Sequence, residues 1–458
     1  PIQHWFFEQN FANANQWNQS IVLDVQEALN TDALQKAVEH IVQHHDALRL
    51  RIQGTNEKRQ AVIASLDECI PFQFIDLSSV PGKELQKALE SQMTELQTSH
   101  DLVNGPIFQC AYFTMRDGMA DKLFIAIHHM AIDGLSWRIL LEDIVRAYDA
   151  ILSGQPVKLP NKTTSFKQWA HKLNDYAQLD LANAAQVWLK AKKGAELPVD
   201  FPDGHDLEES TKSIDVELSV SETFALLQDV PAVYHTHIND ILLIALVTAC
   251  EEWTGRPELR VALESHGRED LFESIDVSRT VGWFTSLYPV FLDVSGAESI
   301  GERIKAVKEQ LQAIPNNGID YGVLRYLNTK FDALKNEPEP QVAFNYLGQF
   351  HQVANDPRFR ISDQQSNAER DPRSQRPHQI FVSGKVAQDQ LQMSFLFSEN
   401  VYRTETIEKL AENYIKSLKE IVAHCTSLDS NGYESMKLLD EQTERDLLQD
   451  VLSELDLD

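Results

Sequence analysis

Two adjacent histidines, His128 and His129, follow a strongly apolar stretch and precede an acidic turn that holds Asp133 and Gly134. Histidine is the side chain whose ordinary pKa lets it take up or release a proton near neutral pH. Successive side chains on a strand point to opposite faces, so one histidine can face a site while the other packs. The pair therefore indicates proton transfer by a single imidazole. The same alternation argues against a shared metal ion, and we predict no metal site.

The flanking sequence predicts how this pair is held. Residues 123–127 are an apolar, β-branched run of strand length, and residues 136–152 carry apolar side chains at helical spacing. We expect a strand, a tight turn and a helix, with Ser136 as the N-cap of the helix. Such a junction can direct one imidazole into a cavity, although a histidine pair beside a core strand is, by itself, more often structural than catalytic.

A second histidine pair, His44 and His45, serves as a comparison. It lies late in a predicted amphipathic helix over residues 30–48, where positive charge interacts favourably with the negative end of the helix dipole. We predict a structural role for this second pair. The two histidine pairs of the chain thus receive different predictions from their surroundings.

Length and charge limit the classes of protein to be considered. The chain has 458 residues, which exceeds one ordinary hydrophobic core, so two lobes are expected. It carries 69 acidic against 41 basic residues, for a formal net charge of −28. This excess of negative charge argues against binding to nucleic acid or to an anionic membrane surface.

The cysteines and the ends of the chain indicate the cellular setting. Cys69, Cys110, Cys250 and Cys425 are far apart and show no metal-ligand spacing, which favours reduced, mostly buried thiols in the cytoplasm. No run approaches the length of a membrane span, and no signal peptide opens the chain. Because the first residues already look like a motif and do not start with methionine, we expect a segment of a longer polypeptide.

Strand-like and helical segments occur in α/β order on both sides of a turn-rich break at residues 154–164. We therefore expect an α/β protein with an N-terminal lobe over residues 1–175 and a C-terminal lobe over residues 176–425. Residues 355–375 are polar and charged and are predicted to be a mobile surface loop. Residues 426–458 are predicted to be an acidic linker or docking segment, because an apolar stripe at helical spacing lies there among acidic residues.

Five stretches resemble, in order, the motifs of the condensation-domain superfamily of nonribosomal peptide synthetases. They are PIQHWFF at 1–7, HHMAIDG at 128–134, ESHGRE at 264–269, SRTVGWFTSLYP at 278–289 and FNYLGQF at 344–350. Leu135, Ser136 and Trp137 after the glycine resemble the epimerization branch, since peptide-bond-forming members more often carry tryptophan directly after it. Ser265 stands where the family has glycine, so the local loop conformation can differ.

The resemblance implies two lobes, each similar to chloramphenicol acetyltransferase, in a V-shaped pseudo-dimer with a central tunnel. It implies epimerisation of the α-carbon of an aminoacyl or peptidyl thioester on the phosphopantetheine arm of an upstream carrier domain in the same chain, with no cofactor bound by the domain itself. A downstream synthetase that docks on the C-terminal segment is a further expected partner. Two alternatives stay open: a peptide-bond-forming condensation domain, and a non-catalytic recruitment domain of the same fold.

The resemblance also implies the residues that carry the chemistry. Two acid/base groups on opposite sides of a planar intermediate can remove a proton from one face and deliver one to the other. By resemblance, His129 and Glu264 lie across the tunnel, and burial there should raise the pKa of the Glu264 carboxyl. Asn345 and Tyr346 are candidates to support the enolate oxygen.

The remaining motif residues are expected to have structural roles. By resemblance, Asp133 orients the motif loop, and His128 and Gly134 are structural parts of the same motif. The residues expected to form scaffold or tunnel lining are Trp137, Arg138, Arg279 and Trp283.

Overall fold

The computed structural model describes residues 1–458 except 56–57, 66–70, 117, 191–193, 195, 350–355, 365, 367 and 430–458. Cys69 and nearly all of the expected C-terminal docking segment lie outside the described residues. The described residues form two large sheets, each with its own hydrophobic core, and one two-stranded sheet of β2 (Leu50–Gln53) and β3 (Gln60–Ile63). The predicted α/β class is confirmed.

The first large sheet has the strand order β11-β1-β6-β5-β4. Its members are β1 (Asn18–Val25), β4 (Phe72–Asp76), β5 (Phe108–Thr114), β6 (Asp121–His128) and β11 (Phe359–Ile361). Strands β5 and β6 pair antiparallel, as the sequence predicts, and the apolar run before the histidines forms the centre of β6. Every residue from 122 to 128 is buried, which makes β6 a rigid support for the residues that follow it.

Helices cover both faces of this sheet. Helices α2 (Thr31–His44) and α4 (Gly134–Leu152) pack against each other over one face, and α3 (Gly82–Thr98) covers the opposite face. The apolar residues of α2 and α4 recur at helical spacing and are buried, because they face the sheet. The short helix α1 (Ile2–Glu8) opens the chain and belongs to the same core.

The second large sheet has the strand order β7-β13-β12-β10-β8-β9. Its members are β7 (Thr211–Glu217), β8 (Glu258–Ser265), β9 (Ser286–Asp293), β10 (Val342–Gln349), β12 (Ile380–Ala387) and β13 (Gln390–Ser398). Burial alternates along β12 and β13, because one face packs on helices while residues of the other face line a cavity.

Three long helices form the core of the second lobe against this sheet. They are α7 (Val220–Tyr234), α8 (Ile238–Thr254) and α12 (Thr404–Asp429). Helix α8 is buried over most of its length, as its almost entirely apolar sequence predicts. The other helices are α5 (Phe166–Tyr176), α6 (Ala182–Lys190), α9 (Ile300–Gln312), α10 (Ile319–Gly322) and α11 (Asp332–Lys335).

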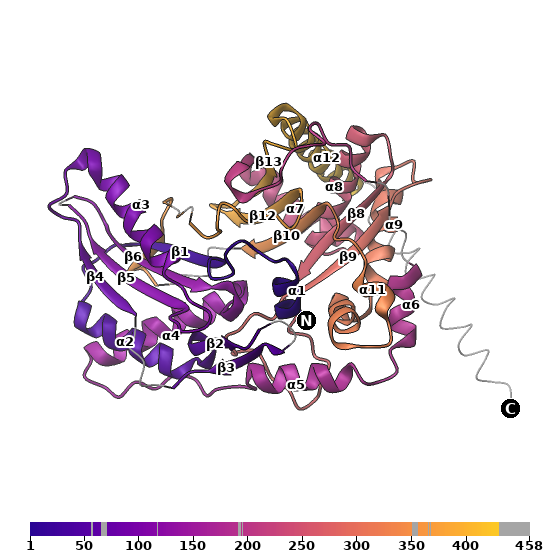
Figure 1. Cartoon of the computed structure of the whole chain (residues 1–458). Coiled ribbons are helices and arrows are strands. Elements are labelled where there is room, and N and C mark those ends of the chain that lie inside the picture. Colours follow the sequence, from indigo (N-terminus) through magenta and orange to yellow (C-terminus); the bar gives the residue numbers. More distant parts are fainter. Residues whose placement is uncertain are drawn as a thin grey trace.

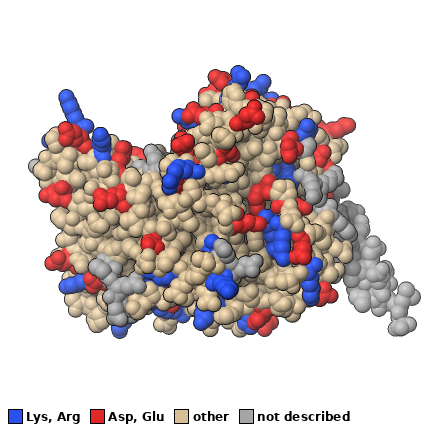
Figure 2. All heavy atoms as spheres, in the orientation of Figure 1, with Lys and Arg blue, Asp and Glu red and all other residues tan. Residues whose placement is uncertain are grey.

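The two large sheets lie in two lobes, and α1 and α5 lie in the region between them (Figure 1). The space-filling view shows the surface hollowed at the upper edge, where the lobes meet (Figure 2). Helix α5 spans the boundary expected at residue 175, and α12 continues beyond the boundary expected at residue 425. The lobes are also joined by the chain itself, through β11.

Strand β11 comes from the C-terminal half of the chain but pairs antiparallel with β1 of the first lobe. The pairing is extended beyond the strand by an isolated bridge between Trp17 and Arg370. The prediction of a mobile surface loop over residues 355–375 is therefore wrong for the residues described there. Its polar composition is explained by its place at a sheet edge, where the backbone forms ladder hydrogen bonds without a large apolar face.

Two further expectations concern cysteines and apolar helices. Cys110, Cys250 and Cys425 are buried, and burial raises the pKa of the Cys250 thiol to about 12. Across the described residues, no single helix has the length and apolar composition of a membrane span. Helices α7 and α8 meet that test only as a pair bent by 98°.

Candidate active site

A cavity of about 430 Å³ lies between the two large sheets. Gln19 of β1 and His129, which follows β6, reach it from the first lobe. Glu264 of β8 and Asn345 of β10 reach it from the second lobe. The fold thus brings one imidazole and one carboxyl, far apart in the sequence, to the walls of a single cavity.

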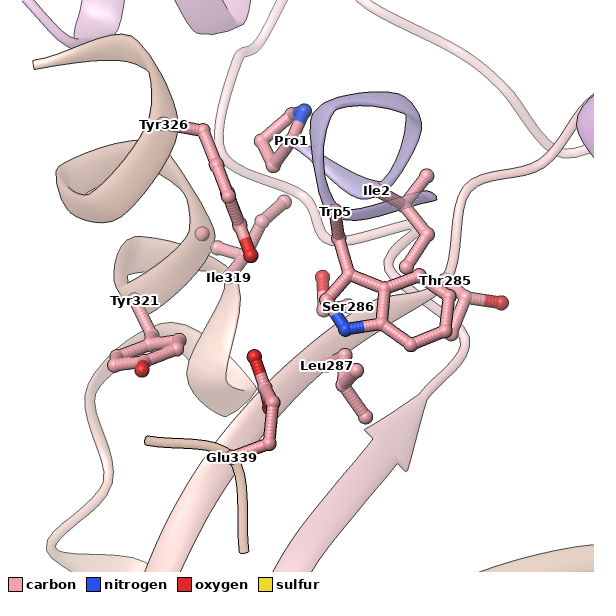
Figure 3. A pocket seen from close by; sticks show the side chains of 11 residues that line it. Pro1, Ile2, Trp5, Thr285, Ser286, Leu287, Ile319, Tyr321, Tyr326 and Glu339 are labelled. Atoms are coloured by element: carbon pink, nitrogen blue, oxygen red, sulfur yellow. The ribbon is translucent and has the colours of Figure 1, made fainter. Parts of the chain in front are cut away.

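A much smaller pocket, of about 20 Å³, shares the side chains of Trp5 and Leu287 with this cavity. Trp5 and Leu287 stand on one side of it, and Tyr326 and Glu339 on the other (Figure 3). A volume of this size has room for about one water molecule. The larger cavity is therefore the candidate active site, and Trp5 is part of its wall.

His129 is held through both nitrogens of its ring. It begins the short 3-10 turn η3 (His129–Ala131) after β6. Its Nδ1 lies 2.8 Å from the carbonyl oxygen of Ile132, which can only accept, so Nδ1 carries the proton. Its Nε2 lies 3.0 Å from the side-chain nitrogen of Gln19, so Nε2 accepts a hydrogen bond from that amide. The basic nitrogen of His129 is therefore Nε2.

Trp137 fixes the orientation of the Gln19 amide. Its indole N–H can only donate and lies 2.9 Å from Oε1 of Gln19. The amide oxygen must face Trp137, so the amide nitrogen must face His129. The ring of Trp283 packs against the imidazole with 4.3 Å between ring centroids. Trp137 and Trp283 thus hold the base itself in place.

His128 is fully buried and has both ring nitrogens satisfied in the neutral form. Its Nε2 donates to the carbonyl oxygen of Ala14 at 2.8 Å, and its Nδ1 accepts from the backbone N–H of Met130 at 3.1 Å. Burial lowers the pKa of His128 to about 3. It lies outside the cavity lining, and its contacts are those of a packed structural residue.

Asp133, and not Ser136, is the N-cap of α4. Its carboxylate accepts from the backbone N–H of Ser136 at 2.8 Å and from the Ser136 hydroxyl at 2.7 Å. The helix begins at Gly134, earlier than expected, so the prediction for Ser136 is wrong. Gly134 is exposed, and an added Cβ would meet nothing within 4 Å, so no steric contact in the described chain requires glycine there.

Asp133 also ties the histidine turn to the second lobe. Nη2 of Arg268 lies 3.0 and 3.1 Å from its two carboxylate oxygens, and each side chain is only 6% exposed. Nη1 of Arg268 donates to the carbonyl oxygens of Val277 and Thr280, each at 2.7 Å. A buried ion pair is costly to break, by about 3–5 kcal/mol when one partner is removed.

Glu264 lies in the cavity wall with one hydrogen-bonding side chain beside it. Nδ2 of Asn345 donates to its Oε2 at 2.7 Å. Burial raises the pKa of the Glu264 carboxyl to about 7, and the charge of Arg370 opposes part of this rise. Burial lowers the pKa of His129 to about 4, and there the charge of Arg370 acts in the same direction. Near neutral pH the imidazole is neutral while the carboxyl is close to half protonated.

Tyr346 does not reach the cavity. Asn345 and Leu347 line it, and the alternation of side chains along β10 turns Tyr346 to the opposite face of the sheet. There Tyr346 packs against the core of the second lobe, and burial raises the pKa of its phenol. The geometry therefore does not support the expectation that Tyr346 contacts an enolate oxygen: its side chain is partly buried against the core of the second lobe.

The charged residues of the cavity that the sequence did not indicate include two neighbours in one segment. Glu369 and Arg370 follow β11 in the segment expected to be a mobile loop, and both line the cavity. The Glu369 carboxylate accepts from the backbone N–H and the hydroxyl of Ser20, at 2.8 and 2.7 Å. The guanidinium of Arg370 lies over the ring of Trp17, 3.6 Å from its centroid.

With this geometry established, comparison with known proteins decides the family. The sequence profile of the condensation domain family matches residues 1–448. The chain belongs to the condensation domain family. A subunit of the linear gramicidin synthase of Brevibacillus parabrevis is 43% identical over 438 residues, which cover 94% of this chain and 8% of that protein. Surfactin synthase subunit 1 of Bacillus subtilis (strain 168) is 35% identical, over 99% of this chain and 13% of that protein. This condensation-family domain thus spans about a tenth of the length of these curated relatives.

Solved structures of the condensation family agree in fold. The epimerization domain from the third module of tyrocidine synthetase B is 36% identical, with a TM-score of 0.87 over 94% of this chain and 96% of that one. The X-domain from teicoplanin biosynthesis is 15% identical, with a TM-score of 0.73 over 92% and 93%. Domains of this family act on substrates tethered to phosphopantetheine carriers and need no cofactor of their own.

The second histidine pair of this condensation-family domain lies away from the cavity. Nε2 of His45 lies 3.0 Å from Asp143, whose other carboxylate oxygen accepts from Arg279 at 2.8 Å. The ligand atoms of His44, His45 and Asp143 lie within 4.8 Å of one another, close enough for a metal ion. Because Arg279 already brings positive charge to Asp143, we keep the prediction of a structural pair without metal. Arg138 is exposed on α4, where it pairs with Glu142 at 3.5 Å.

Proposed function

We propose that this domain epimerises the α-carbon of an aminoacyl or peptidyl thioester held on the phosphopantetheine arm of a carrier domain. The observation that carries the proposal is the placement of His129 and Glu264 in one cavity, on opposite lobes, with opposite pKa shifts. Epimerisation needs one group that accepts a proton and one that donates a proton across the same carbon. Neutral His129 and protonated Glu264 meet both needs near neutral pH.

The chain's own residues divide the reaction between the two walls. When the α-hydrogen faces the first lobe, the Gln19 amide gives up its hydrogen bond to Nε2 of His129. Nε2 then takes the proton, and the electron pair of the broken C–H bond moves into the thioester carbonyl. Glu264 then delivers its proton to the opposite face, and the pair returns to form the new C–H bond. The reverse reaction runs through the same states, with Glu264 as the base and protonated His129 as the acid.

The two groups share one proton in the active form, which sets the expected pH dependence. Below a pH of about 4 both groups are protonated and no base is present, and above about 7 both have lost their proton and no acid is present. Activity should be highest between these values. The window is the same for both stereoisomers, because forward and reverse reactions use the same one-proton enzyme.

Two alternatives are weighed against this proposal. In a peptide-bond-forming domain, His129 would position an amine and would need no second acid/base group. The raised pKa of Glu264 and the 36% identity to an epimerization domain over nearly the whole chain both favour epimerisation. A non-catalytic recruitment domain would not need a histidine held in one tautomer opposite a buried carboxyl.

One experiment distinguishes the three functions. A carrier domain is loaded in turn with L- and D-forms of aminoacyl and dipeptidyl thioesters and incubated with this domain in deuterated water. Deuterium at the α-carbon together with inversion supports epimerisation. Peptide product in the presence of a second loaded carrier, without α-exchange, supports condensation. Neither product, from a folded domain, supports recruitment.

We also propose a cellular location and partners for the domain. We place it in the cytoplasm within a multidomain synthetase, with the carrier upstream in the same chain and without nucleic-acid or membrane partners. The multidomain character of the curated relatives supports the carrier partner. Residues 426–458, of which the structure describes only 426–429, are proposed to reach a downstream synthetase. Deletion of residues 438–458 should weaken transfer to that protein while leaving epimerisation intact.

A further inference from the structure

The negative charge of the intermediate has no charged partner among the residues first considered for it. Proton abstraction places charge on the thioester oxygen, and donors aimed at such a charge are usually a large term in catalysis. Asn345 gives a hydrogen of its side-chain amide to Glu264, and Tyr346 faces the core. The second amide hydrogen of Asn345 is a neutral donor, and a cation in the cavity wall would stabilise the charged oxygen more strongly.

Arg370 is a cavity cation that forms no salt bridge within the described residues, although the carboxyls of Glu369, Glu208 and Glu264 act on its charge from a greater distance. Its Nη1 donates to the carbonyl oxygen of Asn18 at 2.8 Å and approaches that of Glu369 at 3.4 Å. In the described part of the chain, no carboxylate lies within 4.0 Å of this guanidinium, and Nε and Nη2 have no acceptor. Glu369, its neighbour in sequence, directs its carboxylate to Ser20 instead.

A second arginine of the same cavity shows the contrast. Nη1 of Arg376 lies 3.4 Å from the carboxylate of Asp206 and 3.2 Å from the carbonyl oxygen of Gln379, and Nη2 donates to that of Leu396 at 3.0 Å. Arg376 is thus paired by the protein. Arg370 has only carbonyl oxygens and the face of Trp17, so its positive charge remains available to a ligand in the cavity.

The backbone around Arg370 is fixed, which suits a preorganised donor. The isolated bridge joins Arg370 to Trp17, and the backbone N–H of Asn18 donates to the carbonyl oxygen of Glu369 at 2.9 Å. The side-chain amide of Gln16 donates to the carbonyl oxygens of Ala368 and Arg370, each at 3.1 Å. Arg370 lines the same cavity as His129 and Glu264, and its charge acts electrostatically on both of them.

We propose that Arg370 is a further catalytic residue, whose guanidinium donates to the thioester carbonyl oxygen and stabilises the enolate. The inference rests on the proposed epimerisation. The α-C–H bond breaks, its electron pair moves towards the carbonyl oxygen beside Arg370, and the pair returns when the carbon is protonated. Arg370 forms no covalent bond and transfers no proton. Because the enolate is common to both stereoisomers, Arg370 serves both directions equally.

The test is α-proton exchange by Arg370→Ala, measured with L- and D-loaded carriers in deuterated water. We expect kcat to fall by ~10²–10³-fold, the range for loss of an oxyanion donor, with the same factor for both stereoisomers. Guanidinium chloride at low millimolar concentration should restore part of the rate, and sodium chloride at the same concentration should not. Arg370→Lys, which keeps the charge, should retain more activity than Arg370→Ala.

Arg360→Gln is the matched control, since Arg360 is an exposed arginine on β11 and its loss should leave exchange unchanged. A folded Arg370→Ala domain with near-parental kcat, a loss confined to KM, or unequal losses for the two stereoisomers would overturn the inference. If Arg370→Ala does not fold, Arg370→Lys decides: parental kcat with a purely structural loss of melting temperature would also overturn it. Failure of the parent domain to exchange the α-proton is a separate result and refutes the epimerase proposal itself.

Discussion

The two walls of the cavity hold their acid/base groups in different ways. On the first lobe, the imidazole of His129 is hydrogen-bonded through both ring nitrogens, and Trp137 orients the Gln19 amide that contacts it. On the second lobe, Glu264 has one side-chain donor, Asn345, and its pKa is set mainly by burial. Burial thus shifts the pKa on both walls, but only the base is also held by hydrogen bonds at both of its ring nitrogens.

This difference has a consequence for where the shared proton rests. Gln19 stabilises neutral His129 by donating to Nε2, and a proton added to Nε2 would face that donor. The opposite wall favours the protonated carboxyl, because an ionised one would be poorly solvated. Both effects keep the proton on Glu264, so the resting pair is a neutral imidazole and a neutral carboxyl.

Removing the base should give the largest effect. His129→Ala should lower α-proton exchange by ~10²–10⁴-fold, the contribution of a general acid–base group. His128→Ala is the matched variant: it should act through loss of melting temperature, because His128 is buried and lies outside the cavity. A folded, inactive His128→Ala domain, or near-normal exchange by His129→Ala, would mean that the roles are reversed.

Glu264→Gln should distinguish the role of Glu264 from that of His129, since glutamine keeps the shape of the side chain but cannot take up a proton. Inversion should be lost in both directions. Exchange should persist better in the stereoisomer whose α-hydrogen faces His129 than in the other, because only that isomer still meets a base. The measurement is deuterium incorporation without inversion from each pure stereoisomer. Equal, small losses for both would reduce Glu264 to a structural residue.

Gln19→Leu should shift the part of the pH–rate profile that depends on His129. Without the donated hydrogen bond, the pKa of His129 should rise from about 4 towards its usual 6.5, so the acid limb of the rate profile moves to higher pH. A hydrogen bond of about 1 kcal/mol corresponds to a shift of roughly one pH unit. Trp137→Phe should give a smaller shift in the same direction. The control is Gln35→Leu, at an exposed glutamine. An acid limb that does not move in Gln19→Leu would contradict the proposed hydrogen bonds from Trp137 through Gln19 to His129.

The smallest effect concerns stability. The pKa of Glu264 is raised in the fold, from 4.5 to about 7, so the folded protein keeps a proton that the unfolded chain has already released. Stability should therefore be lost as pH rises from 4.5 through 7. Glu264→Gln removes this loss, so its melting temperature should exceed that of the parent at pH 8 but not at pH 5. The same difference at both values would contradict the raised pKa.

The pattern of apolar residues predicted the secondary structure well, both where burial is one-sided, as in α2, and where it is nearly complete, as in α8. Strands β5 and β6 and helices α2 and α8 occur where apolar spacing indicates them. The N-cap was missed because an aspartate and a serine both stand at the start of α4, and spacing alone cannot choose between two capping residues. Tyr346 was assigned to the site by motif, whereas the alternation of β10 would have allowed only one of two neighbouring residues to face it.

The segment after residue 355 was missed for a different reason. A strand that adds to a sheet edge is held by backbone hydrogen bonds, which leave no apolar pattern in the sequence. One signal was present: Asp-Pro-Arg occurs twice, at 356–358 and 371–373. In both copies the backbone N–H of the arginine donates to the aspartate at 2.9 Å, and the two side chains pair at 2.6 and 2.7 Å. Such repeated turns indicate that the backbone of this segment is ordered.

Strand β11 also limits how this fold can be divided or recombined. Cutting the chain between the lobes would leave β1 as an open sheet edge, which is prone to pair with other chains and aggregate. It would also separate Arg370 from Trp17 and Asn18, with which it is in contact. A hybrid domain assembled from two relatives should therefore take its β11 segment from the same parent as its first lobe, although that segment is encoded far downstream.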